Sequence, residues 1–162
     1  MTAENDQGRT FLRHALATLA YRGGKTLRDA TPEFAAFRAD ETSRTPLEIL
    51  SHLGDLLEWA LSISRGQEKW SKPDERPWKE QTERFFGGLK ALDDYLASSG
   101  PLGCPPAQLF QGPIADALTH VGQLAMLRRM SGSPMRGENY FVADIATGRV
   151  GAEQAPPRRE FD

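Results

Sequence analysis

The segment Thr45-Pro46-Leu47-Glu48-Ile49-Leu50-Ser51-His52, which continues as LGDLLEWALSIS to residue 64, carries the clearest helix signal in the chain. A threonine, a proline directly after it and a glutamate three residues later form a capping box, which predicts a helix that begins at Thr45. Its apolar residues recur at the spacing of one helix face, at Ile49, Leu53, Leu56, Ala60 and Ile63. This segment therefore predicts a helix of about five turns with one face in a core.

Three further stretches show the same three- and four-residue spacing of apolar residues. They predict helices over residues 8–29, from near Trp78 to Ala97, and from about Pro113 to just before Gly132. The core-facing residues expected in the first two are Phe11, Ala15, Leu19 and Leu27, and Phe85, Leu89, Leu92 and Leu96. Because glycine lowers helix propensity, the pair Gly23-Gly24 predicts a weak point in the first helix.

The remaining residues, 133–162, lack helix signals and form a short tail. They predict either a small hairpin, with Tyr140-Phe141-Val142 and Arg149-Val150 flanking Ala146-Thr147-Gly148, or an irregular segment packed on the helices. We therefore expect an all-α fold, a four-helix bundle within residues 8–132 that is followed by this tail. A chain of 162 residues suits one domain, which we expect to span residues 1–162.

Charge and composition exclude several classes of protein. Twenty Lys and Arg against 22 Asp and Glu give a net charge of -2, so no basic field favours nucleic acid or an anionic membrane. No apolar run reaches the roughly 20 residues of a membrane-spanning helix, and the polar start MTAENDQGRT predicts no secretory signal. The single cysteine, Cys104, excludes an intrachain disulfide and a cysteine zinc cluster. A cytoplasmic location is the expectation that follows.

The polar residues of interest lie on helix faces that otherwise belong to a core. His52 lies at the edge of the apolar stripe of its helix, while Asp116 and His120 are four residues apart and share one face. Gln123 follows on the same face one turn later, where it can orient His120 or a bound water. Leu127 and Met130 continue that face as hydrophobic residues.

Two histidines and one carboxylate can hold a divalent cation and leave positions open for water or substrate, the pattern of catalytic sites. Such a set suits Zn²⁺, Ni²⁺, Fe²⁺ or Mn²⁺ and does not choose between them. The alternative for the same spacing is a buried ion pair between Asp116 and His120, without a metal.

The segments Thr45–His52 and Asp116–Gln123 resemble the DinB/YfiT-like superfamily. Members typically place one histidine on the second helix, and on the last helix two ligands four residues apart, the second followed by x-Gly-Gln. His52 and the segment His120-Val121-Gly122-Gln123 match this pattern. Asp116 stands where the family usually has histidine, a departure that keeps a metal ligand and adds negative charge. The resemblance implies a four-helix bundle with one divalent transition metal held by His52, Asp116 and His120, often as a homodimer.

The same resemblance carries the functional expectation. Members with a known activity are often metal-dependent transferases of a low-molecular-weight thiol onto small electrophiles, and related members are hydrolases or isomerases. We therefore expect a small-molecule substrate, with such a thiol as the favoured one, and neither nucleic acid nor membrane as a partner. The alternative is a non-catalytic metal- or ligand-binding bundle protein of the stress response. Because one fold hosts many functions, the resemblance alone does not decide between them.

Overall fold

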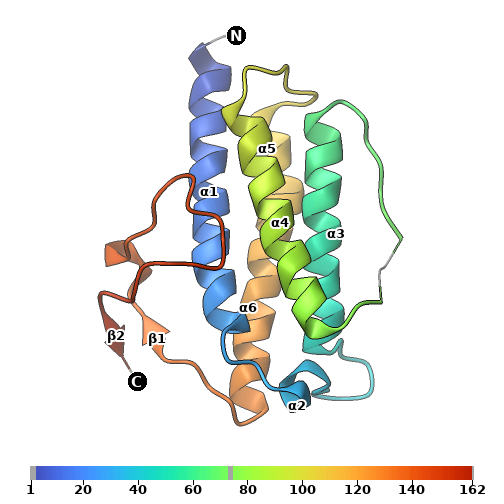
Figure 1. Cartoon of the computed structure of the whole chain (residues 1–162), viewed down its shortest axis with the longest axis vertical. Helices are drawn as coiled ribbons and strands as arrows, with labels where there is room; N and C mark the ends of the chain where they lie inside the picture. The colour runs from blue at the N-terminus through green and yellow to red at the C-terminus, as the bar shows by residue number, and fades with distance from the viewer. Residues whose placement is uncertain (1–2, 73–74, 162) are drawn as a thin grey trace.

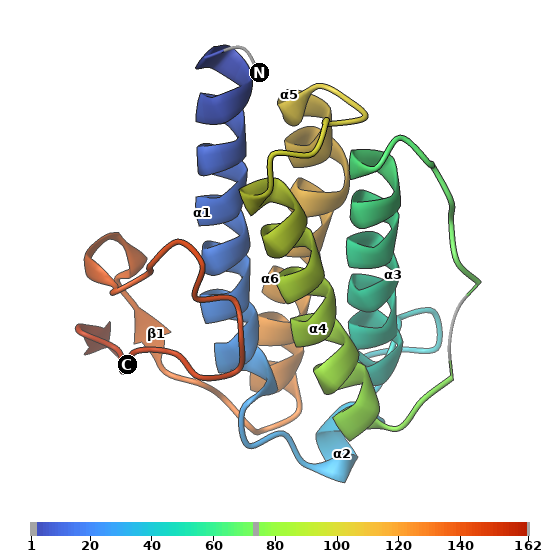
Figure 2. The ribbon, with the colours of Figure 1, turned by 45° about the horizontal axis from the view of Figure 1, so that its top comes forward.

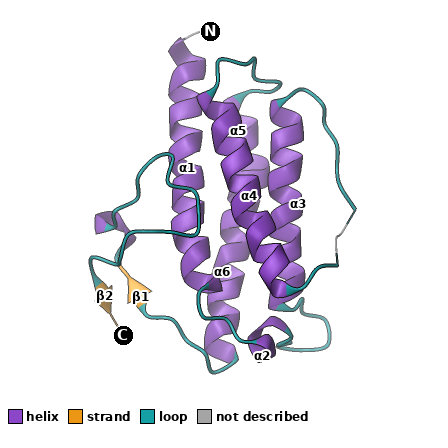
Figure 3. Cartoon of the chain, in the orientation of Figure 1, coloured by secondary structure: helices purple, strands orange, loops and turns teal. Residues whose placement is uncertain are grey.

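The computed structural model describes residues 3–72 and 75–161 of the chain. It is mostly helical, as expected, with one short pair of strands (Figure 3). In chain order its elements are α1 (Ala3–Leu27), α2 (Pro32–Ala35), α3 (Pro46–Ser64), α4 (Trp78–Ala97), α5 (Pro106–Leu109), the π-helical turn η1 (Phe110–Ile114), α6 (Ala115–Met130), β1 (Gly137–Glu138), the 3-10 turn η2 (Tyr140–Val142) and β2 (Glu160–Phe161). In the described part of the chain, no helix has the length and apolar character needed to cross a membrane.

The long helices α1, α3, α4 and α6 lie side by side with their axes roughly aligned (Figures 1 and 2). Helix α1 packs against α4 and α6, and α3 packs against the same two helices, so the four enclose a common interior. Helices α3 and α4 run in the same direction, because the connection between them, described at residues 65–72 and 75–77, returns from the end of α3 to the level of its start before α4 begins (Figure 1). This crossover places the loop beside α3.

The interior is filled by apolar side chains from the four long helices and from α2. Its largest fully buried members are Phe34, Phe85, Leu12, Leu16, Leu19, Ile49, Leu50, Leu53, Leu57, Leu89, Leu92 and Leu96. The predicted start of α3 is confirmed, since the Thr45 hydroxyl accepts from the backbone N–H of Glu48 and the Glu48 carboxylate accepts from the backbone N–H of Thr45. The predicted bounds and core face of α4 are also confirmed.

Helix α1 differs from the prediction in its start and in one core residue. It begins at Ala3 rather than near residue 8, and it continues through Gly23-Gly24 without a break. Phe11, expected in the core, is 58% exposed, whereas its neighbour Leu12 is buried. A Cβ at Gly23 would lie 2.8 Å from the ring of Phe85, so glycine at this position lets α1 and α4 approach closely.

The last helix also begins differently from the prediction. Pro113 lies inside η1 rather than at the first position of the helix, and α5, η1 and α6 follow one another directly. Helix α6 ends before Gly132, which has a φ of 76°, as the sequence predicts. Met130, expected to continue the apolar face, is instead 54% exposed.

The tail packs beside α1 and is closed by β1 and β2, which pair antiparallel at the two ends of the segment (Figure 1). The small hairpin around residues 146–148 is therefore wrong, and the irregular alternative is correct. Glu138 holds the tail to α1: its buried carboxylate accepts from the Tyr21 hydroxyl at 2.6 Å and from Lys25 Nζ at 2.8 Å. Lys25 also pairs with Glu160 of β2 at 2.8 Å.

Candidate metal centre

The three predicted ligands come from two neighbouring helices, α3 and α6. His52 lies in the second turn of α3, whose position in the chain is set by the Thr45 cap, and Asp116 and His120 lie in the first turns of α6. The structure brings all three together: each offers one ligand atom, and these atoms lie within 4.8 Å of one another. This is the group that the residue spacing and the resemblance predict.

The distances within this group are those of converging side chains. His52 Nε2 lies 3.7 Å from Asp116 Oδ2, and His120 Nδ1 lies 3.3 Å from Asp116 Oδ1. The two imidazole rings are 4.7 Å apart between centroids. The Asp116 side chain is 46% exposed, so the group is not the buried ion pair that the spacing also allows.

One hydrogen bond fixes the orientation of His120. Its Nδ1 lies 2.9 Å from the backbone carbonyl oxygen of Asp116, one turn earlier in α6. Because a carbonyl oxygen only accepts, Nδ1 carries the proton in this contact, and Nε2 is left with its lone pair. A ring N–H held by a backbone carbonyl is the usual support of a metal-binding histidine.

The protonation state of His52 also suits a ligand. Burial lowers the pKa of His52 below its ordinary value, the neighbouring His120 and Arg44 lower it further, and Asp116 acts in the opposite direction. The neutral imidazole, which is the form that binds metals, is therefore favoured near pH 7.

Two residues beside the group were not singled out from the sequence. The ring of Trp70, in the loop of residues 65–77, lies 6.0 Å from the His52 ring and 5.5 Å from the Trp59 ring. Arg44 precedes the cap of α3 and lies near enough to influence the charge of His52. The capping box shows from the sequence that Arg44 directly precedes α3. No local pattern predicts that Trp70 lies beside His52, because the path of the connection after α3 brings it there.

Other candidate residues have different surroundings. Gln123 is exposed and makes no hydrogen bond to His120 in the described part of the chain, so it does not orient the His120 ring; its contact with a bound water stays a prediction. Asp55, three residues after His52 in α3, is buried and pairs with Arg84 of α4 at 2.7 Å. The third histidine of the chain, His14, lies apart from the group, with Nδ1 at 3.4 Å from the Thr147 hydroxyl.

A pocket of about 680 Å³ opens beside His52, between α3 and the start of α4. We call it the His52 pocket; its polar lining includes Arg44, Ser51, His52, Asp55 and Gln81. Gln81 is fully buried, and its side-chain amide donates to the Ser51 hydroxyl at 3.2 Å. A volume of this size lies in the range of about 300–1,000 Å³ that is typical of small-molecule sites.

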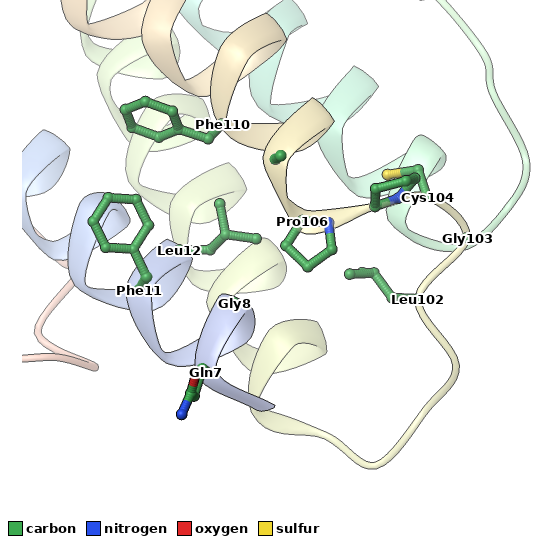
Figure 4. A pocket seen from close by; sticks show the side chains of 11 residues that line it. Gln7, Gly8, Phe11, Leu12, Leu102, Gly103, Cys104, Pro106 and Phe110 are labelled. Carbon is green, nitrogen blue, oxygen red and sulfur yellow. The ribbon is translucent and has the colours of Figure 1, made fainter. Parts of the chain in front are cut away.

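A second pocket of about 910 Å³ lies at the other end of the helices, between α1 and α5 (Figure 4). Its walls are mainly apolar, with Phe11, Leu12, Pro106 and Phe110 around it, and Cys104 is at its edge (Figure 4). Burial raises the pKa of the Cys104 thiol, which keeps it protonated and unreactive near pH 7. Among the described residues that line this pocket, Cys104 is the only one with an ionisable side chain, so the pocket offers volume with little chemistry.

The fold and the site together define a helical protein with a candidate metal centre of two histidines and one carboxylate. Comparison with known proteins adds no relative: no family model, curated protein or solved structure matches the chain.

Proposed function

We propose that this chain is a divalent-metal-binding protein of the DinB/YfiT-like type, with His52, Asp116 and His120 as the metal ligands. The observation that carries the proposal is the convergence of three ligand atoms, one from α3 and two from α6, within 4.8 Å of one another. The donor set fits the ion, since two imidazoles and a carboxylate suit Zn²⁺, Ni²⁺, Fe²⁺ and Mn²⁺ alike.

The activity that we propose is transfer of a low-molecular-weight thiol onto a small electrophile, with hydrolysis as the related alternative. A divalent ion at this centre would lower the pKa of a bound thiol or water, which supplies a nucleophile at neutral pH. Two features of the chain support this activity. The backbone carbonyl of Asp116 fixes the His120 ring, and the His52 pocket gives a small molecule access to one of the three ligands, His52.

A non-catalytic metal-binding protein is the second proposal, and Asp116 favours it. Its carboxylate adds a negative charge where the family usually has a neutral imidazole, and a ligand set with more negative charge holds a cation without making it a stronger acid. The assay is turnover of a panel of thiols and electrophiles. Thiol transfer or hydrolysis that is lost in His52→Ala would support the proposal that the protein is an enzyme. Metal binding without turnover in that panel supports the second proposal.

The experiment that tests the centre itself is metal analysis by plasma mass spectrometry on untagged protein. We expect about one equivalent of a transition metal, lost in both His52→Ala and Asp116→Ala, because three ligands are needed for a tight site of this kind. His14→Ala is the matched control, since His14 lies apart from the group and should keep the metal. No metal in the wild type after reconstitution with Zn²⁺, Ni²⁺, Mn²⁺ and Fe²⁺ would contradict the proposal.

A further inference from the structure

The charged residues that line the His52 pocket are mostly neutralised within the protein. Glu48 accepts from the backbone N–H of Thr45 and pairs with Arg38 at 3.3 Å. Asp55 pairs with Arg84 at 2.7 Å, and both side chains are nearly inaccessible to solvent. Each of these two carboxylates therefore has a cationic partner, and Arg84 is shared with Glu58.

Arg44 differs from these residues in having no partner. Across residues 3–72 and 75–161, its guanidinium makes no hydrogen bond and no ion pair. Glu75 and Arg76, the other charged residues of the lining, contribute one charge of each sign. With Glu48 and Asp55 already paired with other arginines, the guanidinium of Arg44 stays available to a ligand in the His52 pocket.

The position of Arg44 makes this charge relevant to the metal centre. It lines the His52 pocket on one side and, on the other, a depression between α3 and α6 that also includes Thr119 and Gln123. A small molecule in the His52 pocket therefore lies near both His52 and Arg44. A divalent ion at the centre would add to the positive potential of this surface, because Asp116 neutralises one of its two charges.

We propose that the His52 pocket binds a small organic substrate that carries a carboxylate, and that Arg44 recognises this carboxylate. The proposal rests on the metal centre proposed above and names the substrate class of that centre. The planar guanidinium matches a carboxylate with two parallel hydrogen bonds, a geometry that lysine does not offer. A carboxylate fits better than a phosphate here, because one unpaired cation balances a monoanion.

Trp70 provides the apolar surface that such a substrate needs beyond its carboxylate. Trp70 is 49% exposed and its ring lies 6.0 Å from the His52 ring, so part of it is accessible to an apolar group bound beside His52. It also provides a signal, since a molecule or metal that binds near His52 changes the environment of this indole. Trp70→Phe shows how much of a fluorescence change comes from this residue rather than from Trp59 or Trp78.

The test is a titration of metal-free and Zn²⁺-loaded protein with benzoate, benzamide and phenylphosphonate, followed by Trp70 fluorescence and by saturation-transfer NMR. We expect benzoate to bind more tightly than benzamide, and Arg44→Gln to weaken benzoate by about tenfold while leaving benzamide unchanged. Arg44→Lys should recover part of the loss, because it restores the charge without the planar fork. Arg65→Gln, at the opposite end of α3, is the control that keeps the wild-type affinity.

Two results would overturn the proposal. One is equal binding of benzoate by the wild type and Arg44→Gln, and the other is an Arg44-dependent preference for phenylphosphonate over benzoate. Zn²⁺ binding by equilibrium dialysis separates this proposal from the metal centre, since Arg44→Gln should bind Zn²⁺ as the wild type does. If the wild type binds no Zn²⁺, the metal centre fails, and the titration of the metal-free protein still decides the role of Arg44.

Discussion

At the scale of single residues, Arg84 shows how a buried charge connects two helices. Its Nη2 lies 2.7 Å from Asp55 Oδ1 and its Nε lies 2.8 Å from Glu58 Oε1, so α4 is joined to α3 by one guanidinium. The Asp55 side chain is 4% exposed, whereas that of Glu58 is 43% exposed. The two carboxylates therefore share a cation but differ in burial, so we expect their removal to have different effects on stability.

Asp55→Ala is expected to lower the free energy of unfolding by about 3 kcal/mol, because it leaves the guanidinium buried without its closest buried partner. Glu58→Ala, the matched change at the exposed partner, should cost less than about 1 kcal/mol. Urea unfolding followed by circular dichroism measures both. Equal losses in the two variants would show that burial does not decide the strength of this network.

At the scale of elements, the start of α3 matters because it sets where His52 lies along the helix. The cap of Thr45 satisfies a backbone N–H that would otherwise lack a partner at the helix end. Thr45→Ala should therefore cost about 1 kcal/mol of stability, measured by urea unfolding. Thr45→Ser, which keeps the hydroxyl oxygen, is the control and should remain close to the wild type. A full loss in Thr45→Ser would assign the effect to the threonine methyl group instead.

The other half of the capping box makes stability depend on pH. The hydrogen bond from the Thr45 backbone N–H is the main cause that lowers the pKa of Glu48 below its ordinary value of 4.5. The stabilisation from a lowered carboxylate pKa is complete above that ordinary value and is lost as the pH falls through the folded-state pKa. Between about pH 6 and pH 3, Glu48→Gln should lose less stability than the wild type, because its amide keeps the cap without titrating. Parallel pH profiles would contradict this.

Replacing a helical glycine by alanine can raise or lower stability, depending on which atoms lie beside the new Cβ. A Cβ at Gly23 would lie 2.8 Å from the Phe85 ring, whereas at Gly87 of α4 no atom lies within 4 Å. Gly23→Ala should destabilise the protein by about 1–3 kcal/mol through overpacking. Gly87→Ala should stabilise it by about 1 kcal/mol through helix propensity. Thermal unfolding compares the two, and stabilisation by both changes would mean that α1 and α4 can separate at no cost.

Local signals account for the parts of the fold that could be predicted from the sequence. The bounds of α3 and α4 follow from caps and apolar spacing, which are properties of each segment alone. Phe11 was misplaced because spacing defines a wide stripe and does not say which of two adjacent residues, Phe11 or Leu12, faces the neighbours. Pro113 was misplaced because a proline that suits a helix start is also accepted in a π-helical turn when the chain before it is helical.

The candidate site was predictable for a related reason. The apolar residues of α3 and α6 define which face of each helix points to the core, and His52, Asp116 and His120 lie on or beside those faces. The three side chains therefore meet once α3 and α6 are neighbours. Arg44 and Trp70 could not be predicted in the same way. Both lie in loops, and the return of the 65–77 loop along α3 brings residues distant in sequence to the same surface.

At the scale of the whole molecule, the candidate centre joins two helices that no other side-chain ion pair links in the described part of the chain. Helix α3 is tied to α4 through Arg84, and α1 is tied to α4 through the pair of Arg13 and Asp93 at 2.8 Å. Contact between α3 and α6 depends on apolar packing and on the His52 group. A metal held by that group would therefore add a direct link between α3 and α6.

Metal binding and its removal should consequently change the stability of the whole protein. An ion that binds the folded state alone adds about 2.7 kcal/mol when its free concentration is 100 times its Kd. We expect the melting temperature to rise with Zn²⁺ and to fall back when EDTA is added. In Asp116→Asn the rise should be much smaller, because the amide keeps the shape of the side chain and is a far weaker ligand. His14→Ala should respond as the wild type does, since His14 is outside the group. A rise of equal size in Asp116→Asn would place the bound ion elsewhere on the protein, and no rise in the wild type would leave α3 and α6 held by apolar packing alone.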